Sequence, residues 1–151
     1  MEELDKKLLS ILLSNSRAPI SQIAKDLSTS RQRVAKRISG LYAEGVIRRF
    51  TISINWDRLH RFHVVVSMSS NPSVDMDEAI STLRGDEHVT TIYRLVGKPD
   101  TLIHLAIPKN LALLQKKIEE LSELFRPVSM DVGIVTWAEE LGGEKTGKKL
   151  G

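Results

Sequence analysis

The 151-residue sequence contains no cysteine. It therefore cannot form disulfide bonds, cysteine-ligated zinc sites, iron–sulfur clusters or a thiol nucleophile. Its longest apolar runs, such as residues 102–107, are far shorter than the roughly 20 residues that cross a bilayer. The charged first residues, Met1–Lys6, do not resemble a secretory signal. We therefore expect a cytoplasmic protein that makes no contact with membranes.

Aromatic residues are scarce, at 5% of the chain. Trp56 and Trp137 are isolated, so the sequence offers no row of rings on which single-stranded nucleic acid stacks. The four histidines lack the spacing of metal ligands, and no nucleophile, acid and base recur in a catalytic pattern. We expect no metal, no cofactor and no enzymatic activity.

Charge is distributed unevenly along the chain. Residues 1–60 hold 11 basic and 6 acidic side chains, whereas residues 61–141 hold 8 basic and 12 acidic ones. This asymmetry favours a module at the front that binds a polyanion and a second module with another task.

Three helices are predicted in the basic front part. Apolar residues recur with helical spacing over residues 4–12, 20–27 and 34–42. Pro19 suits the first turn of the second helix, and Ser30 is an N-cap for the third, which Gly45 can close. The three small polar residues between the second and third helices predict a helix-turn-helix. Alternation over residues 50–54 predicts a strand after it, as in a winged type.

The remainder predicts a ferredoxin-like domain. Strands are expected at residues 62–69, 89–96, 101–107 and 128–137, with helices over residues 73–84 and after Asn110. This β-α-β-β-α-β order places two helices on one face of an antiparallel sheet, so the fold class is α+β. The domains predicted are residues 1–55, a linker at 56–61, residues 62–141 and a flexible basic tail at 142–151.

The third helix carries the residue types that recognise double-stranded DNA. With its apolar positions turned inward, the residues from Arg31 to Arg37 expose basic side chains and no acid. Arginine and glutamine make bidentate contacts with guanine and adenine, and Lys36 and Arg37 suit phosphates. A solvated charged face is the alternative reading. The predicted DNA-binding residues are Ser30, Arg31, Gln32, Arg33, Lys36, Arg37, Arg48 and Arg49.

The first strand of the second domain is apolar on both faces. Phe62, Val64, Val66 and Met68 share one side, and Val65 lies on the other. A lone ferredoxin-like sheet leaves one face in water, so we expect a second copy of the chain to cover it, unless Val65 is a single exposed apolar residue. A two-fold dimer sets its recognition helices about 34–36 Å apart, one turn of the duplex.

A family resemblance rests on the order and spacing of several short motifs. These motifs are Leu4–Leu9, Asn15–Arg17, Ile23–Ala24, Ser30, Val34, Arg37–Ile38, Leu41, Gly45–Thr51 and Gly97–Leu102. Together they closely resemble the Lrp/AsnC, or feast/famine, transcription regulators of bacteria and archaea, over residues 3–140. The resemblance implies a homodimer joined through its C-terminal sheets, often assembled to tetramers or octamers, that binds pseudo-palindromic promoter DNA.

The same resemblance implies an effector, usually an amino acid, bound between C-terminal domains. Turn amides suit its carboxylate and Asp100 suits its ammonium group. The effector residues carried over are Gly97, Lys98, Asp100 and Thr136. Members that bind amino acids tend to carry threonines early in the last strand, where this chain has Met130–Gly133. An ordinary turn at residues 97–100 is the alternative reading.

Two other functions share this architecture. Siroheme decarboxylases resemble the chain in residues 47–50 and in Tyr93–Arg94, but their histidine–asparagine pair is replaced here by Thr91–Ile92. The other alternative is an architectural DNA-binding protein without an effector.

Overall fold

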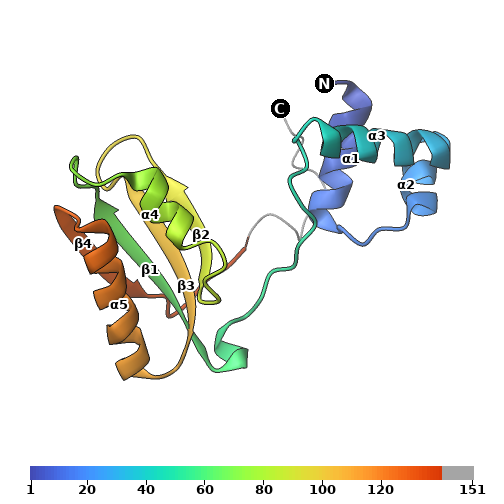
Figure 1. The fold of residues 1–151 in the computed structure, drawn as a ribbon. Helices are drawn as coiled ribbons and strands as arrows, with labels where there is room; N and C mark the ends of the chain where they lie inside the picture. The colour runs from blue at the N-terminus through green and yellow to red at the C-terminus, as the bar shows by residue number, and fades with distance from the viewer. Residues whose placement is uncertain (141–151) are drawn as a thin grey trace. The chain divides into compact units, whose positions relative to one another are not determined.

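The computed structural model describes residues 1–140, which form two compact units (Figure 1). One unit comprises Met1–Ser53 with Glu139 and Glu140, and the other spans Ile54–Ala138. The predicted basic tail at residues 142–151 lies outside the described residues. None of the described helices combines the length and the apolar character that crossing a bilayer requires.

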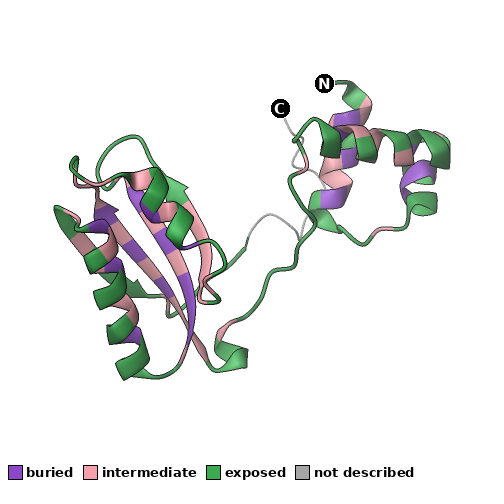
Figure 2. Cartoon of the chain, in the orientation of Figure 1, coloured by how far each residue is buried: buried purple, intermediate pink, exposed green. Residues whose placement is uncertain are grey.

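The N-terminal unit contains the three predicted helices. They are α1 (Glu3–Ser14), α2 (Ile20–Asp26) and α3 (Arg31–Ala43). Their apolar stripes meet in one small core, visible as the buried segments of Figure 2. The buried members are Leu8, Leu12, Ile23, Ala24, Val34 and Leu41.

The predicted helix ends are confirmed. Pro19 occupies the N-cap of α2, and the Ser30 hydroxyl caps α3 by accepting from the Arg33 backbone N–H at 3.1 Å. Gly45 follows α3 with φ of +73°, a backbone conformation that glycine adopts without steric cost.

The strand predicted at residues 50–54 is wrong. These residues are extended but pair with no described strand, so the described part of the N-terminal unit has no wing. Phe50, Ile52 and Ile54 remain 51%, 74% and 37% exposed. An alternation of apolar and polar residues indicates an extended backbone with one face suited to burial. A strand forms only where the backbone of a partner strand completes its hydrogen bonds.

The C-terminal unit confirms the ferredoxin-like order. A 3₁₀ turn, η1 (Asp57–Leu59), precedes β1 (Arg61–Ser69), so the segment predicted as a linker begins this unit. The elements that follow are α4 (Met76–Thr82), β2 (Val89–Arg94), β3 (Thr101–Pro108), α5 (Leu111–Phe125) and β4 (Ser129–Ile134). The antiparallel sheet has the order β2-β3-β1-β4.

Helices α4 and α5 cover the same face of this sheet (Figure 1). Val64 and Val66 of β1 pack there with Ile103 of β3, Leu121 and Phe125 in one apolar core. The alternate residues of the strands therefore lie on the opposite face. This open face is the surface for which a covering partner was predicted.

Candidate DNA-binding surface and effector-binding turn

The turn between α2 and α3 holds the two helices in a helix-turn-helix arrangement. The Ser28 N–H donates to Lys25 O at 3.0 Å, and the Thr29 N–H donates to Ala24 O at 2.9 Å. This pair of bonds is a Schellman motif, which normally places glycine where Ser28 stands with φ of +50°. Ser30 then begins α3, so the direction in which α3 leaves the turn is fixed by local hydrogen bonds.

The first two turns of α3 present their polar side chains to solvent. Arg31, Gln32, Arg33 and Lys36 are all exposed, and α3 contains no acidic residue. The nearest carboxylate to Arg33 is Glu2, at 3.9 Å between two side chains that are mostly exposed. Such a loose exposed pair contributes little, so Arg33 remains available for another anion.

Arg37 forms an ion pair within the N-terminal unit. Its Nε and one terminal nitrogen donate to the two carboxylate oxygens of Asp5, each at 2.7 Å. Asp5 lies on α1 and is 0% exposed, whereas the Arg37 side chain is 27% exposed. The Arg37 hydrogen bonds hold the pKa of Asp5 below its usual range. Arg37 therefore holds α3 against α1, and its predicted contact with DNA stays a prediction.

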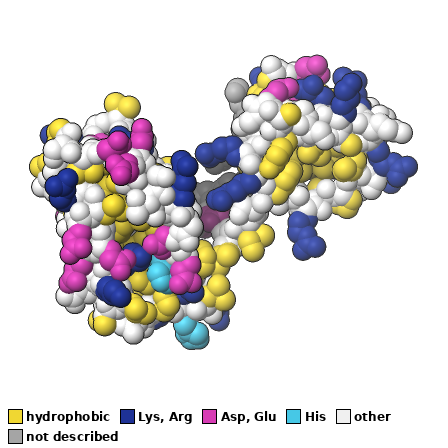
Figure 3. Space-filling view, viewed as in Figure 1, with side chains coloured by type: hydrophobic (Ala, Val, Ile, Leu, Met, Phe, Trp, Pro, Cys, Tyr) yellow, Lys and Arg dark blue, Asp and Glu magenta, His cyan; other side chains and the backbone are white. Residues whose placement is uncertain are grey.

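Arg48 and Arg49 lie beyond α3 and are exposed. The preceding residue, Ile47, packs on the N-terminal core and donates its N–H to Leu41 O at 3.0 Å. This anchor ties the segment to the end of α3. In Figure 3, Lys and Arg side chains gather over this unit, whereas acidic side chains are more frequent over the C-terminal unit.

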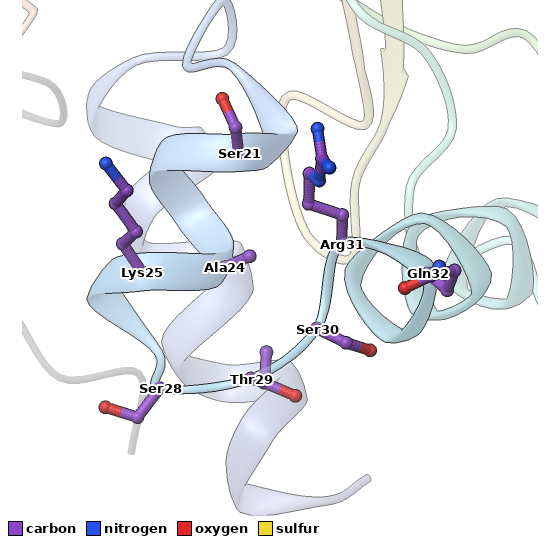
Figure 4. A pocket seen from close by; sticks show the side chains of 8 residues that line it. All are labelled: Ser21, Ala24, Lys25, Ser28, Thr29, Ser30, Arg31 and Gln32. Carbon is purple, nitrogen blue, oxygen red and sulfur yellow. The ribbon is translucent and has the colours of Figure 1, made fainter.

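The sequence analysis predicted DNA contacts on α3 and overlooked the polar side chains of α2. A hollow of about 620 Å³ opens between α2, the turn and the start of α3 (Figure 4). It is lined by Ser21, Ala24, Lys25, Ser28, Thr29, Ser30, Arg31 and Gln32. Three of the predicted DNA-binding residues thus share a concave surface with residues of α2. A signal was present, since Ser21 and Lys25 have the i, i+4 spacing of one helix face.

The predicted effector turn is closed by Asp100. Gly97 has φ of +117°, and the Leu95 N–H donates to Asp100 O at 2.7 Å. The Asp100 carboxylate accepts from the Ser70 N–H and from the hydroxyls of Ser70, at 2.6 Å, and Thr101, at 3.0 Å. The Ser70 hydroxyl and N–H, with the Thr101 hydroxyl, hold the pKa of Asp100 below its usual range. The carboxylate therefore binds its own chain and holds the turn in shape, and its predicted contact with an ammonium group stays a prediction.

Thr136 does not meet this turn within one chain. Thr101, next to the turn, pairs with Met68 of β1, while Ile134 pairs with Val64 and the Val135 N–H donates to His63 O. The turn and Thr136 therefore lie toward opposite ends of β1, about 20 Å apart along the strand. Residues 97–100 and Thr136 come together only if two copies of the chain each contribute one of them.

The open face of the sheet combines apolar and imidazole side chains. Val65 of β1 pairs with His104 of β3, and both are half-buried. His63 Nε2 lies 3.3 Å from His104 Nδ1, and the ring of Tyr93 meets His104 edge-on with centroids 5.5 Å apart. Burial lowers the pKa of His104, and the charge of nearby His63 adds to this effect. The face is thus suited to a contact in which the His104 imidazole is neutral.

Comparison with known proteins agrees with this arrangement. An AsnC-type helix-turn-helix domain matches residues 1–41. The HTH-type transcriptional regulator PH0061 of Pyrococcus horikoshii is 33% identical over 120 residues, which cover 80% of this chain and 81% of that protein. The HTH-type transcriptional regulator LysM of Saccharolobus solfataricus is 29% identical over 139 residues, covering 91% and 96% of the two chains.

Solved structures show the same two-part fold. The crystal structure of PH0061 superimposes with a TM-score of 0.84 at 29% identity, covering 94% of this chain and 97% of that one. The leucine response regulatory protein LrpA of Mycobacterium tuberculosis has a TM-score of 0.79 at 18% identity, covering 96% and 99%. At that identity the second likeness concerns the fold alone.

Proposed function

Because the chain belongs to the Lrp/AsnC family of DNA-binding transcription regulators, we propose that it recognises its operator with the exposed start of α3. Arg31 and Gln32 read base edges in the major groove. Lys36, Arg33, Arg48 and Arg49 neutralise phosphates, while the Ser30 cap fixes the first turn. The observation that carries this proposal is the acid-free, solvent-exposed first turn of α3, held by the Ser30 cap and by the bonds of the preceding turn.

Binding measurements on selected DNA test these roles. Fragments that the purified protein retains from genomic DNA give the preferred duplex, and a scrambled duplex serves as its control. Replacing Arg31 or Gln32 with alanine is expected to cost about 1–3 kcal/mol on the preferred duplex and to relax base preference. Replacing Lys36 or Arg49 is expected to weaken both duplexes equally. Unchanged affinity and preference in all four variants would contradict the assignment of α3.

We further propose that two copies pair through the open sheet faces around Val65. An apolar residue between half-buried imidazoles supports this contact, and closed two-fold dimers are the commonest soluble oligomers. Larger assemblies, tetramers or octamers, can be built from such dimers. Light scattering at micromolar concentration is expected to give a dimer or a multiple of it. The variant Val65→Glu is expected to shift the mass toward a monomer, and a monomeric parent would exclude the pairing.

An amino-acid effector fits best between two copies. We assign its carboxylate to Lys98 and the backbone at Gly97 of one copy, and its polar contacts to Thr136 of another. Asp100 acts here by holding the turn in shape. Calorimetric titration with a panel of amino acids tests this site, and Lys98→Ala is expected to weaken whichever ligand binds. Binding that survives both Lys98→Ala and Thr136→Ala would remove the site.

We assign the chain no catalytic step. Its relatives are named as transcriptional regulators, and the histidine–asparagine pair of the siroheme decarboxylases is Thr91–Ile92 here. A tetrapyrrole absorbance band in the purified protein would contradict this assignment.

A further inference from the structure

Two histidines that are 41 residues apart in the sequence meet on the open face of the sheet. His63 of β1 lies two residues before Val65, and His104 of β3 pairs with Val65, so all three side chains project from the same face. His63 Nε2 lies 3.3 Å from His104 Nδ1, and the rings are tilted by 53° with their centroids 5.3 Å apart. The two rings therefore approach each other through one nitrogen of each, and their faces do not stack.

The distance between these two nitrogens is the one that a shared metal ion requires. Zinc binds histidine nitrogens at about 2.0–2.1 Å in tetrahedral geometry, so two nitrogens on one ion lie about 3.3–3.4 Å apart. A typical N–H···O hydrogen bond is shorter, at about 2.9–3.0 Å between the heavy atoms. The ring of Tyr93 packs edge-on against His104 and supports the orientation of this imidazole. The pair therefore has the nitrogen spacing of two ligands on one ion.

The residue types identify the class of ion. Imidazole nitrogen suits Zn²⁺, Ni²⁺ and Cu²⁺, whereas Mg²⁺ and Ca²⁺ take oxygen ligands. Within residues 1–140 no cluster of three or more ligand side chains occurs. One chain thus supplies two of the four ligands of a closed tetrahedral site, and an ion held by His63 and His104 presents its other two positions to whatever covers the face.

Two-fold pairing of the open faces supplies the missing ligands. In a two-fold contact the same surface patch lies on both sides of the interface. An ion on the two-fold axis receives equivalent ligands from both copies, so the two imidazoles of one chain become four in the dimer. Four nitrogen ligands fill a tetrahedral coordination sphere.

We propose that His63 and His104 form half of a site for a zinc-class ion, and that the same two side chains of a second copy complete it. The proposal rests on the pairing of open sheet faces proposed above, and it adds an ion that joins the two copies. It differs from the expectation of no metal, which considered spacing along the sequence alone. Metal availability becomes an input to assembly that is separate from the amino acid at residues 97–100. A hydrogen bond between two neutral imidazoles is the other account of this contact, and it predicts no metal binding.

Zinc titration of the full chain without an affinity tag tests the site. After bound metal is removed with a chelator, calorimetry at neutral pH is expected to show one zinc ion bound per two chains. Cobalt(II) in place of zinc is expected to give the visible absorption of a tetrahedral site. His63→Ala and His104→Ala each remove two of the four ligands. Each is expected to weaken zinc binding at least as much as loss of an outer-shell partner, which is about 10–100-fold.

A matched control uses another histidine of the same unit. His60 follows η1, is exposed and takes no part in the contact between the two rings. His60→Asn is therefore expected to keep the zinc affinity of the parent, and asparagine tolerates the φ of +53° at this position. Circular dichroism of each variant shows that the fold is retained.

Sedimentation with and without zinc separates failure of the site from failure of the pairing. Zinc is expected to raise the dimer fraction of the parent and to leave that of both alanine variants unchanged. A parent that pairs but binds no zinc would overturn the metal site and leave the pairing intact, as would equal zinc affinity in the parent, His63→Ala and His104→Ala. One ion per chain would overturn the shared site. A parent that stays monomeric with and without zinc would overturn the proposed pairing itself.

Discussion

The helical and sheet units differ in how they are stabilised. Six apolar side chains are buried in the core of the N-terminal unit, whereas eleven are buried in the C-terminal core, among them Phe125. Each unit adds an ion pair, Arg37 with the fully buried Asp5 in the helical unit and Lys117 with the largely buried Asp86 in the sheet unit. A small unit that presents a charged face to DNA has few residues left for its core, so a polar contact helps to orient its helices. The following predictions test this difference, from the largest expected effect to the smallest.

Truncation of the largest buried side chain is expected to have the greatest effect. Phe125→Ala removes a ring that is 0% exposed in the C-terminal core and should lower the free energy of unfolding by about 3–5 kcal/mol. Trp56 and Trp137 both belong to this unit, so their fluorescence follows its unfolding in urea, while circular dichroism adds the helices of the other unit. A loss below about 1 kcal/mol would mean that apolar packing does not dominate here.

The ion pair of the N-terminal unit is the next test. Arg37→Met leaves the buried Asp5 carboxylate without its cation, and we expect a loss of about 3 kcal/mol. Replacing both partners, as in Asp5→Leu with Arg37→Met, should restore most of this loss, because the uncompensated charge is gone. Urea denaturation followed by helical circular dichroism measures the free energy of unfolding of both variants. A double variant as unstable as the single one would show that the pair itself, rather than an unpaired charge, determines the stability.

The two units should lose stability in different pH windows. The folded pKa of His104 is lowered by burial, so its contribution is present above about 6.5, the pKa of unfolded histidine, and declines as the pH falls below it. The folded pKa of Asp5 is lowered by Arg37, so its contribution is present above about 3.9 and is lost as the pH falls through the folded pKa. As the pH is lowered from 8 to 4, the free energy of unfolding that tryptophan fluorescence reports in urea should therefore decline before that of the N-terminal unit. His104→Gln should flatten that first decline, and an unchanged profile would exclude His104 as its cause.

The smallest expected effect on stability concerns the turn of the helix-turn-helix, where a substitution should stabilise the unit rather than destabilise it. Ser28 adopts φ of +50° at a position where glycine is unstrained, so Ser28→Gly should stabilise the N-terminal unit by about 0.5–1 kcal/mol. Ser39→Gly, inside α3, is the control and should destabilise it by about 0.5 kcal/mol. Destabilisation by Ser28→Gly would indicate that its side chain contributes to the turn.

Much of the architecture could be predicted because its signals are local. Ser30, Asn110 and Gly45 mark helix ends by hydrogen bonds or backbone conformations that involve only a few neighbouring residues. The unmatched charge at the start of α3 could also be predicted, since helical spacing alone turns Arg31 and Lys36 away from the core.

The contacts that sequence reasoning missed join residues that are distant in the sequence. Arg37 pairs with Asp5, 32 residues away, and Asp100 binds Ser70, 30 residues away. The strand predicted at residues 50–54 does not form for a related reason. An extended backbone needs a pairing partner, and the described residues supply none.

The sequence by itself determined the helices, the four strands of the sheet, their order and the basic character of the front part, since periodicity, caps and charge act between near neighbours. Only the tertiary structure decided which charged side chains bind partners within the chain and which face solvent. It joined Asp5 to Arg37, closed Asp100 onto Ser70, and placed Ser21, Lys25 and Arg31 around one hollow. Coulombic and hydrogen-bond energies depend on distance in space, and folding sets that distance independently of separation along the chain.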